Sequence, residues 1–364
     1  MKTYLFFKTK ELVKKINSPT EFYEVKNNNV NLLIKKSYKN KRGRPFSVNL
    51  PKIIKISPEA AGLFVGEGYL GRGCIVFANS NERAIDIMIE FLKQFNIPLK
   101  FYLEISTKGE SNDLLKKCKI FWEKHLGIKL NRIRLREEFY NSGNLGTVHI
   151  SIFNSLLSKL LKQLINLSKK KAEKNKEIAI GYLKGIIAAE GNINVKKSTN
   201  CVYMVRISAS KPEEREHYKR CLERAGINIH CEDMPTISPE EGIKKGWKTT
   251  KGRAGAVIIS RWDNFVKIFE LNLLELDKNK KDKFIKYFVN NQFTKQFLDF
   301  EKFIGGEFTM KEAQNLFGFK GRHLSRILTL MSKGYISRRK LNQVKFAYKL
   351  TKKYHSLYNK LKTI

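Results

Sequence analysis

The sequence predicts an α+β fold in which one α–β unit occurs twice and a small domain follows. The first observation is a repeated pattern: an apolar, helix-like segment rich in small residues, then Glu-Gly, then a strand-like segment, at 57–78 and again at 179–199. The second is that both copies continue into a matching amphipathic helix, at 81–97 and at 211–227. The third is the length, because 364 residues exceed what one hydrophobic core usually holds.

A further match extends the repeat to its end. The strand-like segments at 148–154 and 257–263 both reach a Ser, carry an aromatic residue two positions later, and lead into an amphipathic helix. Each unit is therefore predicted as helix, strand, strand, helix, strand or strands, helix (αββαβα in its simplest form), with one face of its sheet left uncovered. Repeat 1 has an additional predicted helix at 112–126. Two units side by side would form a pseudo-symmetric, concave saddle. Two independent α+β domains of common origin are the alternative.

These patterns divide the chain into five parts. They are a basic N-terminal arm or small domain at 1–56, repeat 1 at 57–168, a Lys-rich linker at 169–176, repeat 2 at 177–290, and a C-terminal domain at 294–364.

The charge of the chain predicts a polyanionic partner. Lys and Arg number 71 against 34 Asp and Glu, a formal net charge of +37. Counterion release from a nucleic-acid backbone would favour binding to such a surface, whereas a lysine-rich composition imposed by an AT-rich genome is the alternative. The 42% apolar residues exclude wholesale disorder, and no apolar run is long enough to predict a membrane-spanning helix. Five cysteines without a CxxC pair and the lack of a signal-peptide pattern lead us to expect a cytoplasmic protein without a membrane partner.

The N-terminal arm is a candidate DNA-binding segment. Residues 1–50 hold 12 basic and 3 acidic side chains, and the segment KRGRP at 41–45 resembles the core of an AT-hook. The resemblance implies that Arg42 and Arg44 enter a narrow minor groove of DNA. A basic turn that leads into the folded core is the alternative.

The two apolar helices are expected to pack on each other. Small residues recur at a spacing of four, as Gly62 and Gly66 in the first helix and as Gly181, Gly185 and Ala189 in the second. Glycine inside a helix costs about 1 kcal/mol relative to alanine, so its repeated use needs a reason. Small residues on one helix face allow two backbones to approach closely. We therefore expect the helices to form a pseudo-twofold pair.

Both helices are predicted to end in an acid, Glu67 in the first and Glu190 in the second. The pairing would bring two carboxylates together at helix ends where the dipole favours a cation. A divalent metal with hard oxygen ligands would resolve this conflict and could act on a phosphodiester. A solvated glutamate at a helix end is the alternative for either residue alone.

At these residues the chain resembles a known family. The segments AAGLFVGEG at 60–68 and LKGIIAAEG at 183–191 resemble two copies of the LAGLIDADG motif. The doubled pattern over 57–290 is similar to that of single-chain LAGLIDADG homing endonucleases. The resemblance implies that the motif helices form the interface between the halves. It also implies that Glu67 and Glu190, at the eighth motif position, bind a catalytic Mg²⁺ or Mn²⁺.

The resemblance also assigns further residues. Gly68 and Gly191, which follow the two acids, are assigned to the same metal site. A basic residue ahead of the last strand, Lys251 or Arg253 in repeat 2, would stabilise phosphate charge. The aligned stretch of repeat 1 has no basic residue, which leaves open whether one strand or both are cut. The strand residues assigned to the duplex are Arg72, Lys196, Lys197 and Arg206.

The C-terminal domain has the element order of a winged helix. Thr309 and Glu312 form a capping-box pattern that predicts a helix, and a second helix at 320–333 precedes strands at 335–340 and 344–350. A small helical cap with a solvated basic face is the alternative. The residues assigned to DNA are Lys320, Arg322 and Arg326 on the second helix and Arg338 and Arg339 on the hairpin.

Together these features predict a monomeric, Mg²⁺-dependent, sequence-specific double-stranded DNA endonuclease of the homing type. Two alternatives remain open. The first is a non-catalytic transcription regulator that joins a LAGLIDADG-like domain to a helix-turn-helix. The second is an RNA-splicing maturase that acts on intron RNA.

Overall fold

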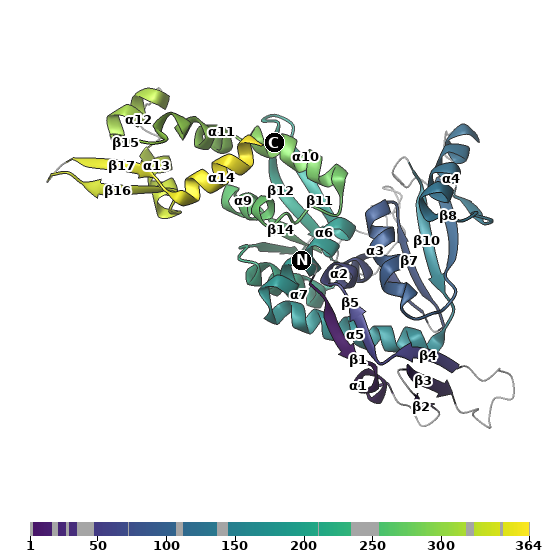
Figure 1. The fold of residues 1–364 in the computed structure, drawn as a ribbon. Helices are drawn as coiled ribbons and strands as arrows, with labels where there is room; N and C mark the ends of the chain where they lie inside the picture. Colours follow the sequence, from purple (N-terminus) through teal and green to yellow (C-terminus); the bar gives the residue numbers. More distant parts are fainter. Residues whose placement is uncertain are drawn as a thin grey trace. The chain divides into compact units, whose positions relative to one another are not determined.

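The structure is a computed structural model of mixed α+β class (Figure 1). It describes residues 3–16, 21–26, 29–34, 47–71, 73–106, 112–136, 145–209, 211–233, 255–317, 324–342 and 345–363. The chain divides into two compact units. Unit 1 comprises Met1–Ile193, Met204–Ser260 and Lys267–Lys281, and unit 2 comprises Asn194–Tyr203, Arg261–Val266 and Asp282–Ile364.

The N-terminal part of unit 1 is folded. Strand β1 (Leu5–Lys8) pairs antiparallel with β5 (Ile53–Ile56), and the short helix α1 (Thr9–Lys14) follows β1. Between them, β2 (Glu21–Lys26), β3 (Asn29–Ile34) and β4 (Ser47–Pro51) form an antiparallel sheet. The 1–56 segment thus leads through β5 directly into the first motif helix.

Helix α2 (Pro58–Glu67) begins repeat 1, and the hydroxyl of Ser57 caps it by accepting a hydrogen bond from the Ala60 backbone N–H at 3.0 Å. The sheet of this repeat has the order β6-β7-β10-β8-β9. Its strands are β6 (Gly68–Leu70), β7 (Ile75–Asn79), β8 (Lys100–Ser106), β9 (Ile133–Arg136) and β10 (Thr147–Ile152). Buried Phe77, Leu103 and Ile150 lie on one face of the sheet. Helices α3 (Glu82–Lys93) and α5 (Ser155–Lys174) complete the repeat, and the predicted additional helix is confirmed as α4 (Asn112–Leu126).

Repeat 2 has the corresponding order of elements. Helix α6 (Lys176–Glu190) leads into a sheet of order β11-β12-β14-β13. Its elements are β11 (Gly191–Lys196), β12 (Cys201–Ser208), α7 (Pro212–Arg224), β13 (His230–Asp233), β14 (Gly255–Ile259) and α9 (Trp262–Glu270). The motif helix of each repeat thus passes into an edge strand, whose neighbour pairs with the last strand of the repeat.

The Lys-rich segment at 169–176 differs from the predicted linker, because α5 continues through it to Lys174. Ser168 and Ala172 are buried, so this part of α5 keeps one face against the core despite its lysines. Asn175 ends α5 and caps α6, since its side-chain oxygen accepts a hydrogen bond from the Ile178 N–H at 3.0 Å. The two repeats are therefore joined by a one-residue break between two helices.

The C-terminal part of unit 2 contains the predicted sequence of two helices and a hairpin. These are α12 (Met310–Phe317), α13 (Leu324–Ser332), β16 (Ile336–Lys340) and β17 (Phe346–Leu350). The capping box is confirmed, because Glu312 accepts from the Thr309 N–H at 2.6 Å and the Thr309 hydroxyl accepts from the Glu312 N–H at 3.2 Å. Further elements are α10 (Lys278–Val289), α11 (Gln292–Asp299), a 3₁₀ turn (Phe300–Phe303), β15 (Glu307–Phe308) and α14 (Lys352–Lys362), and the sheet order is β15-β17-β16. Among the described residues, no helix has both the length and the apolar composition needed to cross a bilayer.

Candidate active site

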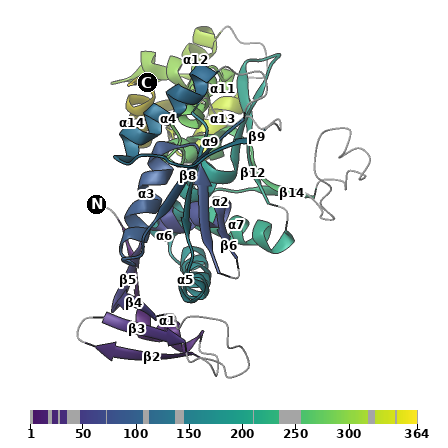
Figure 2. The same cartoon turned by 90° about the vertical axis from the view of Figure 1, so that its right-hand side faces the viewer.

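Helices α2 and α6 pack backbone to backbone (Figures 1 and 2). A Cβ added to Gly62 would overlap the carbonyl oxygen of Tyr182, and one added to Gly185 would overlap the carbonyl oxygen of Glu59. A Cβ added to Gly66 would overlap that of Ala189. The predicted packing through small residues is therefore confirmed.

The contact between the two helices is reciprocal. Gly62 faces Tyr182, and Gly185 faces Glu59. In sequence, Gly185 is as far from Gly62 as Tyr182 is from Glu59, namely 123 positions. Residues offset by the same number of positions thus make reciprocal contacts.

Each motif helix ends at its acid and passes directly into a strand. Gly68 follows Glu67, and Gly191 follows Glu190, both with extended backbones. A Cβ on Gly68 would overlap the Phe64 carbonyl oxygen, and one on Gly191 would overlap that of Ile187. Glycine therefore allows each helix to end without a loop, which holds both acids at the end of the helix pair.

The two carboxylates lie close enough to repel each other. Burial raises the pKa of Glu190 to about 7, and the charges of Glu67 and Glu214 add to the shift, while Lys280 opposes it. Burial also raises the pKa of Glu67, again opposed by Lys280. Part of the Glu67 side chain reaches solvent, but the surrounding protein still removes hydration from its carboxyl group. The site therefore carries negative charge that the protein only partly balances, at helix ends that favour a cation.

Lys280 is a site residue that sequence reasoning missed. Its Nζ donates hydrogen bonds to the carbonyl oxygens of Ile187, at 3.1 Å, and of Ala188, at 2.5 Å, in the last turn of α6. Asp277 holds it from the other side, with its Oδ2 3.6 Å from Nζ. Burial lowers the pKa of Lys280, while Asp277 and the two acids of the site act to raise it. No signal in the sequence separates this lysine from the others in its Lys-rich surroundings.

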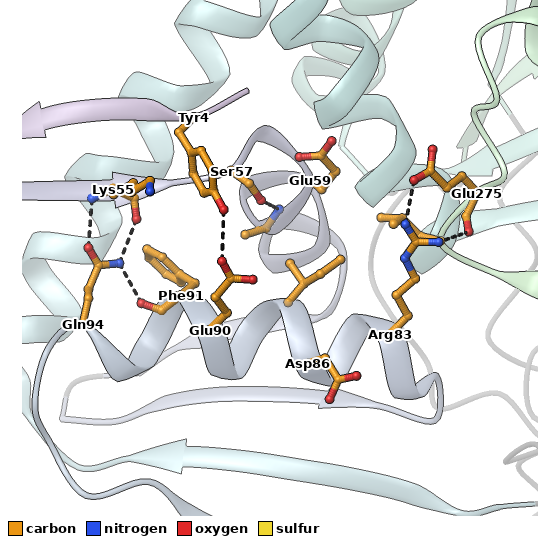
Figure 3. A pocket seen from close by; sticks show the side chains of 13 residues that line it. Tyr4, Lys55, Ser57, Glu59, Arg83, Asp86, Glu90, Phe91, Gln94 and Glu275 are labelled. Carbon is orange, nitrogen blue, oxygen red and sulfur yellow. Dashed lines mark hydrogen bonds and ion pairs between the residues drawn. The ribbon is translucent and has the colours of Figure 1, made fainter. Parts of the chain in front are cut away.

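The segment before Lys280 is fastened to both repeats through Glu275. Its Oε2 lies 2.7 Å from Nζ of Lys184 on α6, and its Oε1 lies 2.6 Å from Nη2 of Arg83 on α3. Burial acts against the charge of Glu275, but the hydrogen bonds and charges of Lys184 and Arg83 keep its pKa below the usual value. Figure 3 shows Arg83 reaching Glu275 at the edge of a pocket of about 330 Å³, which also contains Tyr4. This anchoring positions the first turn of α10, and with it Lys280.

The residues present fit a hard divalent cation. Glu67 and Glu190 offer carboxylate oxygens, and a cation near them would act against the effect of burial, which raises the pKa of both acids. Within the described part of the chain, no group of three or more His, Cys, Asp and Glu side chains is arranged to hold a metal ion. A pair of carboxylates suits Mg²⁺, which usually keeps several waters and takes oxygen ligands from a bound phosphate.

Only some of the other residues predicted to act at the site or to contact DNA lie in the described part of the chain. Outside the described residues are Arg42, Arg44, Arg72, Lys251, Arg253, Lys320 and Arg322, together with the side chain of Arg326. Lys196 and Lys197 are exposed at the β11–β12 turn, and Arg206 is half-buried on β12. Arg338 and Arg339 are exposed on β16, where Arg339 is paired with Glu307.

Repeat 1 carries a ring stack that sequence reasoning did not single out. On neighbouring strands β8 and β10, the rings of Tyr102 and His149 stack with their centroids 4.2 Å apart. The guanidinium groups of Arg132 and Arg134 lie 5.6 and 5.7 Å from the Tyr102 ring. The pairing arises from the register of the two strands, because Tyr102 and His149 lie 47 positions apart in the chain.

Comparisons with known proteins give structural neighbours only. No protein-family model matches the chain, and no curated protein matches it. The solved structure of I-DmoI in complex with DNA and Mn is 15% identical, with a TM-score of 0.33, and the match covers 59% of this chain and 94% of that one. The N-terminal LAGLIDADG domain of DUF199/WhiA is 12% identical, with a TM-score of 0.34, over 61% of this chain and 82% of that one. Full-length DUF199/WhiA from Thermatoga maritima is 14% identical, with a TM-score of 0.33, over 84% of this chain and 90% of that one. At these identities and scores, the neighbours assign no function to this chain.

Proposed function

We propose that this protein is a metal-dependent, sequence-specific double-stranded DNA endonuclease of the homing type. The observation that carries the proposal is the pairing of Glu67 and Glu190 at the joined ends of two closely packed helices, with Lys280 beside them. Folding opposes such a pair of acids, because burial raises both pKa values and the charge of Glu67 raises that of Glu190 further. A strained acid pair of this kind is typical of a functional site.

In this proposal, 57–168 and 177–290 are two pseudo-symmetric LAGLIDADG repeats, as the resemblance implies. The reciprocal contact of Gly62 and Gly185 supports the symmetry, and so do the corresponding strand orders of the two sheets. Both acids belong to one chain, which supports action as a monomer. The N-terminal segment, the repeats and a winged-helix C-terminal domain would form one DNA-binding protein.

The proposed chemistry uses the charges of the site. Glu67 and Glu190 would hold Mg²⁺ or Mn²⁺, which when bound supplies Lewis-acid activation of water and stabilises charge on the phosphate. Lys280 keeps a positive charge at the end of α6, where it would face the developing charge on a bound phosphate. Lys251 or Arg253 would add to that charge in repeat 2.

The proposed DNA contacts follow from exposure and charge. Lys196 and Lys197 are exposed at a hairpin turn, and Arg338 and Arg339 along an edge strand. These positions suit contacts to phosphates, whereas half-buried Arg206 would reach a duplex from the sheet itself. The remaining residues assigned to DNA are Arg42, Arg44, Arg72, Lys320, Arg322 and Arg326.

A DNA-binding regulator without catalysis is the second candidate. The strongly basic unit 2 favours it, because this unit holds 21 Lys and Arg against 6 Asp and Glu. Such a surface would bind DNA whether or not the acid pair acts on it.

Cleavage of a selected target separates the two candidates. Duplexes bound by the chain would be selected from a randomised library and incubated with protein and Mg²⁺. The endonuclease proposal requires specific cutting that is lost in the Glu67→Gln, Glu190→Gln double variant. Glu59→Gln, at the opposite end of α2, is the matched control and should cut normally. Tight binding without cutting would support the regulator, and cutting by the double variant would exclude the proposed site.

A further inference from the structure

Three separate pieces of chain form unit 2: Asn194–Tyr203, Arg261–Val266 and Asp282–Ile364. The first is the tip of the β11–β12 hairpin, and the second is the first part of α9. Both belong by sequence to repeat 2. The third piece contains the whole C-terminal segment. This segment therefore shares a compact unit with two parts of the preceding repeat.

Trp262 holds the first turn of α9 inside the C-terminal core. Its indole N–H donates a buried hydrogen bond to the Thr294 hydroxyl at 2.9 Å. Its ring lies 4.6 Å from the ring of Phe293 and 5.9 Å from that of Tyr335, between centroids. Separating α9 from the C-terminal segment would expose a large aromatic surface and break the hydrogen bond of a buried donor. The two therefore behave as one body.

Two polar contacts extend this attachment. Nζ of Lys333, at the end of α13, lies 3.0 Å from Oδ2 of Asp263 in the first turn of α9. The thiol of Cys201, in the hairpin, donates to the carbonyl oxygen of Asn290 at 3.4 Å, just after α10. The hairpin tip and the C-terminal segment are thus linked through separate points of the same unit.

Exposed basic side chains occur on all three pieces. They are Lys196 and Lys197 on the hairpin tip, Arg261 before α9, Lys283 and Lys286 on α10, and Arg338, Arg339 and Lys340 on β16. β16 is the edge strand of its sheet, so its basic side chains border an open edge. A polyanion is the partner that such a charge distribution favours.

We infer that unit 2 binds duplex DNA as one rigid body, with the hairpin tip and the β16 edge contacting the same duplex at a fixed spacing. The inference rests on the proposed function only in taking duplex DNA as the ligand. A C-terminal domain on a flexible linker would bind its DNA segment at several distances from the segment bound by the hairpin tip, because a flexible linker can span different distances. A rigid unit would accept one spacing, because inserted base pairs rotate and shift the second subsite.

Footprinting without divalent metal tests this inference independently of cutting. The full chain would be bound to a library-selected duplex, and hydroxyl-radical protection compared with that of two charge-removal variants. Lys196→Ala with Lys197→Ala should remove protection of one segment, and Arg338→Ala with Lys340→Ala that of another on the same duplex. Lys302→Ala with Lys311→Ala removes the same charge elsewhere in unit 2 and should leave both segments protected.

The decisive probe is a duplex with five base pairs inserted between the two protected segments. On this duplex, a rigid unit 2 should protect only one of the two DNA segments. The affinity of the chain for the duplex should fall about tenfold. The inference is overturned if the affinity is unchanged and the far footprint moves with the insertion, as a tethered domain would allow. It is also overturned if neither variant changes the footprint. Both results leave the cleavage test of the two acids unaffected.

Discussion

The side-chain nitrogen of Lys280 lies 2.5 Å from the carbonyl oxygen of Ala188, two residues before Glu190. Carbonyl groups in the last turn of a helix carry partial negative charge, so this lysine neutralises the end of α6. Its charge also acts to lower the pKa of both acids of the site, against the larger effect of burial, which raises them. The positive charge of Lys280 therefore stabilises both the C-terminal end of α6 and the negative charge of the acid pair.

Replacing Lys280 should impair catalysis more than binding. In Lys280→Met, we expect the single-turnover cleavage rate to fall about a hundredfold, because a positive charge near the reacting phosphate is lost. Lys278→Met removes an exposed lysine from the start of the same helix and is the matched control. Equal rates for the native chain and Lys280→Met would remove Lys280 from the proposed site.

Substitution at the helix contact should destabilise the fold. Gly62→Ala places a Cβ where the Tyr182 carbonyl oxygen lies, so we expect the free energy of unfolding to fall by about 3 kcal/mol. Gly73→Ala is the control, because a Cβ there meets no atom within 4 Å. Urea denaturation measures both variants. A loss at Gly73 as large as that at Gly62 would argue against the contact as the cause.

The acid pair should make stability fall as pH rises. An acid whose pKa is higher in the folded than in the unfolded state stabilises the fold at pH values below its unfolded-state pKa. That contribution is lost as the pH rises through the folded-state pKa. For Glu190 this window runs from 4.5 to about 7. Relative to the native chain, we expect the free energy of unfolding of the Glu67→Gln, Glu190→Gln variant to rise by about 2 kcal/mol from pH 5 to pH 8.

The comparison with that variant is needed because other groups titrate nearby. Burial lowers the pKa of His217 from 6.5, which acts in the opposite sense below that pH. The difference between the two chains cancels this contribution. Thermal unfolding at both pH values, with and without Mg²⁺, is the measurement. Mg²⁺ should stabilise the native chain at pH 8 and leave the variant unchanged, and a stability difference that does not vary with pH would contradict the acid pair.

Removing the carboxylate of Glu275 should loosen the segment that carries Lys280. In Glu275→Gln, the largely buried Lys184 and the exposed Arg83 lose their shared partner. We expect the free energy of unfolding to fall by about 2 kcal/mol, mainly because Lys184 is left without its counter-charge. Glu270→Gln, which removes a contact to Lys267 within α9, should cost much less. Calorimetric unfolding compares the two. Similar losses would show that Glu275 has no special role.

Several local features could be predicted from the sequence because adjacent residues decide them. The cap at Ser57, the capping box at Thr309, the additional helix at 112–126 and the close approach at Gly62 are all confirmed. Each depends on helix spacing or on a hydrogen bond within one turn. The α+β class follows from the same patterns.

The tertiary structure alone decided which distant side chains surround the acid pair and which fill the C-terminal core. It brought Lys280 to α6, joined Glu275 to Arg83, and placed Trp262 in the C-terminal core. In a chain with 71 Lys and Arg, no local pattern distinguishes the lysine that meets the acid pair. The sequence by itself determined the two helices that end in acids. Packing between segments far apart in the chain determined the charges that surround those acids, because electrostatic contacts depend on distance in space.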